Sequence, residues 1–176
     1  MICRAILVAL AACVCRAAPA AGTPEYEVKA AYVYNFAKFI EWPDTEPPES
    51  VTVCIYGKDP FGGFLDEAVR GKLVHGLPVM LRRLAEGEES WDACQMIFFG
   101  VGNSAAHVDA VLVRLRGRSI VTVGEADGFA ERGGMIGLVV EHGRVRFDIN
   151  LAAIAEGHLQ VSSRLVELGR VVKGKK

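Results

Sequence analysis

Three short and almost purely apolar segments constrain the fold of this chain more than any other feature. They are residues 51–56, 94–99 and 120–123, and β-branched, aromatic or sulfur-containing side chains dominate them. A strand buried on both faces has this near-continuous apolar pattern, whereas a strand with one solvated face alternates. Helical segments lie between the apolar runs. The sequence therefore predicts an α/β fold with a mostly parallel sheet that is covered by helices on both faces.

The remaining segments extend this sheet. Residues 78–84 alternate weakly and predict an edge or second strand, because proline is tolerated where a strand begins. Residues 135–140 and 145–149 flank the turn Glu141-His142-Gly143-Arg144, so we expect an antiparallel hairpin at one edge of the sheet. Further helices are expected from Asp59 through Val69 and over residues 104–115, 151–156 and 163–171.

The first helix is expected to begin at Thr23. Threonine is a favoured N-cap, Pro24 suits the first helical position, and acidic residues follow in the first turn. An apolar stripe rich in aromatic side chains then continues at helical spacing as far as Trp42-Pro43, where the proline ends the helix. The stripe is either a core face or a partner-docking surface, and the docking candidates are Tyr34, Phe36, Phe39 and Trp42.

Residues 1–20 have the features of a secretory signal peptide. Arg4 supplies the positive charge, residues 5–14 form the apolar region, and Ala18-Pro19-Ala20 fits the cleavage pattern. The apolar region is too short to span a bilayer, which needs about 20 residues. We therefore expect an exported protein with a single domain over residues 21–176.

A second processing route stays open. Leu10-Ala11-Ala12-Cys13 resembles a lipobox, in which Cys13 would be acylated and become the mature N-terminus. This route would add a lipoprotein tether to a membrane and would leave the fold unchanged.

Signal cleavage changes both the net charge and the cysteine count. Removal of Arg4 and Arg16 leaves 18 basic against 21 acidic residues, a charge of −3, which gives no electrostatic reason to expect nucleic acid as a partner. Two of the five cysteines remain, Cys54 and Cys94. In an oxidising compartment an even number favours a disulfide, and the alternative is two buried free thiols.

Polar residues follow the predicted strands where their carboxyl ends should meet. Ligands of parallel sheets collect beyond this edge. The alternatives are ordinary turns with helix caps or a small-molecule cleft. The candidate residues for the cleft are Lys58, Asp59, Asn103, Ser104 and Glu125.

One segment imitates an enzyme motif. Gly100–Ala105 matches G-x-G-x-x-A, and Glu125 lies about where a ribose-binding acid would. The match does not follow the first strand of the chain, and an exported protein meets little dinucleotide, so we do not expect nucleotide binding. We also expect no catalytic residues, cofactor or metal, because no nucleophile motif is present and the histidines lack metal-ligand spacing: His75, His107, His142 and His158.

The segment Glu27–Pro43 resembles the opening of the YfiR family of exported proteins. Other family-like motifs follow in order, so that the resemblance covers about residues 25–172. These motifs are Val53–Gly57, Asp59–Gly62, Cys94 at the start of a strand, Val121–Val123, Phe129–Ala130, Gly133–Ile136, Val145–Asn150 and Ser162–Leu165.

The resemblance implies a non-enzymatic regulator. The best-understood members of this family are dimeric periplasmic α/β proteins that bind the periplasmic sensor domain of a membrane diguanylate cyclase. They thereby repress cyclic di-GMP and biofilm formation, in response to the redox state of the envelope. Cys54 and Cys94 match a family disulfide. Two features differ from the family pattern: the second cysteine pair of some members is absent near Gly133–Ile136, and Gln95 replaces a common histidine.

Overall fold

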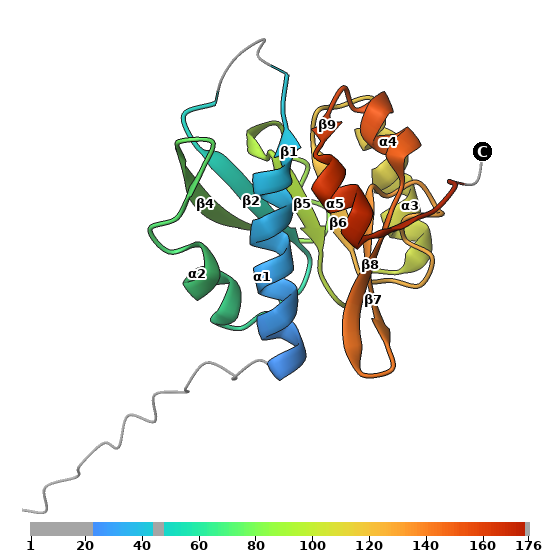
Figure 1. Ribbon diagram of the computed structural model, residues 1–176, viewed down its shortest axis with the longest axis horizontal. Coiled ribbons are helices and arrows are strands. Elements are labelled where there is room, and N and C mark those ends of the chain that lie inside the picture. Colours follow the sequence, from blue (N-terminus) through green and yellow to red (C-terminus); the bar gives the residue numbers. More distant parts are fainter. Residues whose placement is uncertain (1–22, 44–47, 175–176) are drawn as a thin grey trace, which may run out of the picture.

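A curled sheet forms the centre of the molecule (Figure 1). The computed structural model describes residues 23–43 and 48–174. In spatial order the strands are β10 (Arg170–Val171), β8 (Arg144–Ile149), β7 (Ile136–Glu141), β6 (Val121–Gly124), β5 (Met96–Phe99), β2 (Val51–Tyr56), β4 (Leu77–Leu84) and β3 (Leu73–Val74). All neighbours are parallel except the pairs β7–β8 and β3–β4. The predicted mostly parallel α/β sheet is therefore confirmed.

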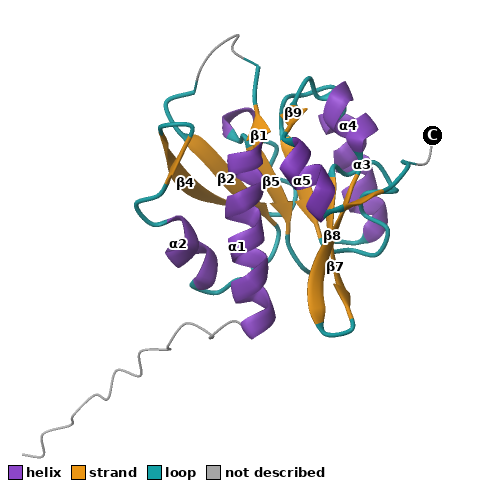
Figure 2. Cartoon of the chain, in the orientation of Figure 1, coloured by secondary structure: helices purple, strands orange, loops and turns teal. Residues whose placement is uncertain are grey.

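Helices cover both faces of this sheet (Figure 2). One apolar core lies under α1 (Pro24–Phe39), α2 (Phe64–Val69), α4 (Leu151–Glu156) and α5 (Ser163–Leu168). A second core lies on the other face, under α3 (Ala105–Leu115) and the short 3-10 helix η1 (Trp91–Ala93). The central strands contribute side chains alternately to the two cores, which explains why residues 51–56 and 96–99 are apolar almost throughout.

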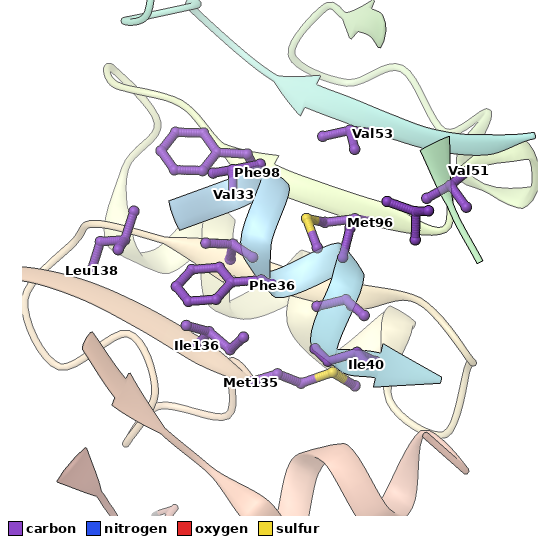
Figure 3. Packing of buried hydrophobic residues seen from close by; sticks show 14 of the residues in the cluster. Val33, Phe36, Ile40, Val51, Val53, Met96, Phe98, Met135, Ile136 and Leu138 are labelled. Carbon is purple, nitrogen blue, oxygen red and sulfur yellow. The ribbon is translucent and has the colours of Figure 1, made fainter. Parts of the chain in front are cut away.

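The aromatic stripe of α1 contributes to the first core. Figure 3 shows Val33, Phe36 and Ile40 among side chains of β2, β5 and β7, and all three are fully buried. The rings of Phe36 and Phe147 lie edge to face with their centroids 5.0 Å apart. Burial of each of these side chains contributes about 2 kcal/mol. The helix is therefore held along the sheet mainly by its apolar face.

Two helices end earlier than the sequence predicted. Ile40 has extended backbone torsions, φ −114° and ψ 136°, so the first helix ends at Phe39 instead of continuing to Trp42. Residues Ile40–Glu41 form β1, which pairs with β9 (Gln160–Val161) in a separate two-stranded sheet. The last helix ends at Leu168, because Arg170–Val171 pair with β8. The predicted edge hairpin, β7–β8, is consequently flanked by β10.

The predicted helix starts agree with the structure to different degrees. Ser104 and Asn150 cap α3 and α4, since their side chains accept hydrogen bonds from backbone N–H groups. Thr23 is the N-cap of α1, but its side chain makes no capping bond. Asp59 does not open a helix; it accepts a bond from the Phe61 backbone N–H in a turn, and α2 begins at Phe64.

A disulfide joins Cys54 of β2 to Cys94, which lies just before β5 in the sequence. The two Cα atoms are 5.8 Å apart, and both residues are buried. The ion pairs Arg114–Glu89 and Arg118–Asp92 connect the segment before Cys94 to α3 and its C-terminal turn. The predicted disulfide is confirmed, and it attaches this segment to the sheet.

Two sequence predictions lie outside the described residues: the signal peptide over residues 1–20 and the lipidation candidate Cys13. Within residues 23–43 and 48–174, no helix has both the length and the apolar character needed to cross a membrane.

Removal of the disulfide should lower the free energy of unfolding by about 4 kcal/mol, because the bridge restricts the unfolded chain over a separation of 40 residues. The measurement is urea unfolding of the wild type and of Cys54→Ala/Cys94→Ala, each with and without reductant. Reductant should destabilise only the wild type. Equal stability of the oxidised wild type and the double variant would contradict a stabilising bridge.

Candidate functional site

The loops that follow β2 and β5 lie side by side at the carboxyl edge of the sheet. Lys58 and Val101 form an isolated antiparallel bridge between these loops. The Asn103 side-chain amide donates to the carbonyl oxygens of Tyr56 and Gly100, at 3.1 and 3.0 Å. A Cβ atom at Gly100 would lie 2.2 Å from the Lys58 carbonyl oxygen. The glycine at this position is therefore explained by the close approach of the two loops.

Glu125, which follows β6, contacts α1. The Lys29 ammonium lies 2.5 Å from Glu125 Oε2 and 2.5 Å from Glu25 Oε1. The Tyr26 hydroxyl donates to Glu125 Oε1 at 3.0 Å. Lys29 is only 4% exposed, so its charge is buried where the helix meets the sheet, whereas Glu125 is half-buried and Glu25 is exposed.

The pKa values of this cluster reflect burial and pairing. Burial alone lowers the pKa of Lys29, but hydrogen bonds to Glu125 and Glu25 outweigh it and raise this pKa above its ordinary value. Burial and the neighbouring Glu125 carboxylate raise the pKa of Tyr26 to about 12. The cluster is therefore most stable with Lys29 protonated and Tyr26 neutral.

The other two candidate cleft residues make structural contacts of their own. Asp59 Oδ2 lies 2.8 Å from Arg83 Nε, and Ser104 caps α3. The fold thus brings all five candidates to one edge of the sheet, where they enter separate sets of contacts. Ligand binding by Lys58, Asp59, Asn103, Ser104 and Glu125 stays a prediction.

The docking candidates from the first helix differ in their exposure. Phe36 is fully buried and belongs to the core, whereas Tyr34, Phe39 and Trp42 are half-buried. The Trp42 indole N–H donates to the Gln95 carbonyl oxygen at 3.1 Å, which fixes the ring beside the start of β5. Three of the four candidates therefore have surface available for a partner.

Tyr34 and Trp42 form one surface with residues of the β3–β4 hairpin. The Tyr34 hydroxyl donates to the Leu73 carbonyl oxygen at 3.3 Å, and the rings of Trp42 and His75 have centroids 6.3 Å apart. His75 Nε2 lies 2.9 Å from the Ile40 carbonyl oxygen. The Leu73 residue is 57% exposed. We name these four residues, Tyr34, Trp42, Leu73 and His75, the α1–β3 surface.

Sequence reasoning missed Leu73 and His75. The strand β3 has only two residues, so it has no periodic pattern, and the hairpin alone brings it to α1. Among the residues that the structure describes, no three His, Cys, Asp or Glu side chains gather in an arrangement that could hold a metal ion.

Glu125→Gln should destabilise the protein by about 2–3 kcal/mol, because it removes one of the two carboxylates that neutralise the buried Lys29. The matched control is Glu27→Gln on the exposed side of the same helix, with an expected change within about 0.5 kcal/mol. Chemical denaturation at neutral pH measures both. A similar effect of the two substitutions would show that the buried pair has no special role.

Stability should fall as the pH rises from 10 to about 12. Tyr26 ionises more readily in the unfolded chain than in the folded protein, so the stability from its raised pKa is complete below pH 10 and is lost as the pH rises to about 12. The pKa of Lys29 is also raised in the folded protein, so its deprotonation likewise lowers the stability as the pH rises. Urea unfolding across this range should show a shallower decline for Tyr26→Phe than for the wild type. The same pH dependence of stability in both proteins would show that ionisation of Tyr26 does not contribute to the decline.

The described domain matches a known family along nearly its whole length. A family model described as YfiR/HmsC-like matches residues 26–170, from the first turn of α1 to the first residue of β10. A comparison with individually curated proteins finds no match. The matched range includes the Lys29–Glu125 pair, the disulfide and the α1–β3 surface. The chain therefore belongs to the YfiR/HmsC-like family.

Proposed function

We propose that this chain is an exported, non-enzymatic regulatory protein that binds the periplasmic part of a membrane signalling protein. The partner is most simply a diguanylate cyclase, which the protein represses, so that cyclic di-GMP falls. The single observation that carries this proposal is the family match over residues 26–170, because it spans the folded domain and is not limited to one motif.

The α1–β3 surface is the proposed contact with the sensor. Aromatic rings are favoured at protein interfaces because they combine a large apolar area with a polar edge. Trp42 and Tyr34 are held by hydrogen bonds to the backbone, so little side-chain entropy is lost when a partner covers them. Leu73 adds an exposed apolar group beside them.

To repress its partner, the regulator needs only to bind two conformations of the sensor domain with different affinities. A regulator that binds the inactive conformation of a sensor domain more tightly than the active one shifts the sensor toward the inactive state. The regulator therefore needs no catalytic group of its own. Its effect ends when the interface is weakened, which makes an interface substitution the direct test.

Leu73→Glu should relieve repression and raise cyclic di-GMP to the level of a deletion strain. The substitution places a charge on the proposed interface at a residue that is 57% exposed, so the fold should be preserved. The matched control is Val140→Glu, a residue that is 49% exposed on the β7–β8 hairpin, and it should repress like the wild type. Cyclic di-GMP is measured in a deletion strain complemented with each variant, at equal protein levels.

Crosslinking identifies the partner in the same strains. A photoreactive residue at position 73 should capture a membrane cyclase, and the same residue at position 140 should not. Capture of a different membrane sensor, with cyclic di-GMP unchanged on deletion, would keep the regulatory class and reject the cyclase. Equal behaviour of Leu73→Glu and Val140→Glu would reject the α1–β3 surface as the interface.

A further inference from the structure

A hollow of about 660 Å³ lies between α3, α4 and the segment that follows β10. This volume is within the range of small-molecule sites. None of its lining residues belongs to the α1–β3 surface or to the candidate cleft at the strand ends. In Figure 1, α3, α4 and the C-terminal segment lie close together on the side of the molecule away from α2.

The walls of the hollow are set by close backbone packing. A Cβ atom at Gly157, which ends α4, would lie 2.8 Å from Met135 Cε and 2.9 Å from the Arg118 carbonyl oxygen. The buried Asn150 side chain donates to the Ala130 carbonyl oxygen at 2.8 Å and caps α4. These contacts hold α4 beside the end of α3, so the hollow is part of the packed structure.

Apolar side chains at the hollow are unusually exposed. Val113 of α3 is 64% exposed and Val171 of β10 is 51% exposed, and both line it. They come from elements that are far apart in the sequence. An apolar ligand between them would remove this surface from water, which is favourable in proportion to the area covered.

The charges around the hollow favour an anion. Arg116, Arg132 and Lys173 line it, against the single carboxylate of Glu156. Arg116 Nε lies 3.8 Å from Glu156 Oε2, and Arg132 Nε lies 2.9 Å from Asp109 Oδ1. Among the described residues, Lys173 is therefore the lining cation without an ion-pair partner. The hollow therefore combines an apolar lining with one exposed cation, Lys173, that a ligand carboxylate could pair with.

Arg132 provides a fixed donor among these cations. Its Nε donates to Asp109 Oδ1 at 2.9 Å, and its Nη1 donates to the Asp127 carbonyl oxygen. Within the part of the chain that the structure describes, the buried Nη2 has no hydrogen-bond acceptor. Buried donors are nearly always satisfied, and a carboxylate in the hollow that Arg132 lines would supply an acceptor.

We propose that this hollow is a binding site for a small amphipathic carboxylate, with its apolar body between Val113 and Val171 and its charge toward Arg132 and Lys173. The inference goes beyond the regulatory function and does not depend on which membrane protein is the partner. The ligand site can therefore be disproved while the regulatory function holds, and the regulatory function can be disproved while the ligand site holds.

The test uses the purified mature protein and two defined probes. The fluorescent anion 8-anilinonaphthalene-1-sulfonate should bind with one-to-one stoichiometry, and octanoate should displace it, whereas the neutral octanamide should displace it at least about tenfold less well. Lys173→Gln should weaken octanoate binding about tenfold, and Val113→Glu should weaken it further by placing a carboxylate in the hollow.

Matched controls lie elsewhere on the surface. Lys72→Gln removes another exposed lysine, just before β3, and Val140→Glu adds a carboxylate on the β7–β8 hairpin; neither should change the affinity. Arg132→Gln should also weaken binding, and Lys173→Gln keeps the test valid if that variant fails to fold. Absence of octanoate binding at millimolar concentration would overturn the proposal. Equal displacement by octanamide, or a loss of affinity in Lys72→Gln equal to that in Lys173→Gln, would also overturn it.

Discussion

The ion pair between Lys29 and Glu125 fixes the position of the first helix along the sheet, against which its apolar face holds it. A buried charge is costly by several kcal/mol unless an opposite charge accompanies it. Lys29 has two such partners, Glu25 in its own helix and Glu125 at the end of β6. Only one position of the helix along the sheet brings all three groups together. That position also places Phe36 against Phe147 in the core.

The opposite face of the sheet is held by a covalent constraint. Cys54 and Cys94 connect β2 to the segment that leads into β5, and ion pairs attach the same segment to α3 and the turn after it. Each face therefore has a long-range ionic or covalent connection in addition to its apolar core. Because the two connections involve different strands, β2 and β6, they restrain the sheet at separate places.

The surfaces considered for recognition differ in their internal contacts. In many parallel sheets the carboxyl edge of the strands is open, whereas here the Asn103 side chain bonds to backbone and the Glu125 side chain bonds to α1. Of the exposed apolar side chains, Leu73 lies on the α1–β3 surface, and Val113 and Val171 line the hollow beside α3. The proposed regulatory contact and the proposed ligand site therefore lie away from this edge.

The sequence by itself determined the parts that have a local physical signal. Continuous apolar runs predicted β2, β5 and β6, Ser104 predicted the start of α3, and the two cysteines of the mature chain predicted the disulfide. Only the tertiary structure decided the end of α1 at Phe39, the strands β9 and β10, and the position of Leu73 beside Tyr34. These features involve two-residue strands or single contacts whose partners are distant in sequence. Such pairing leaves no periodic pattern, because its energy comes from groups that the fold alone brings together.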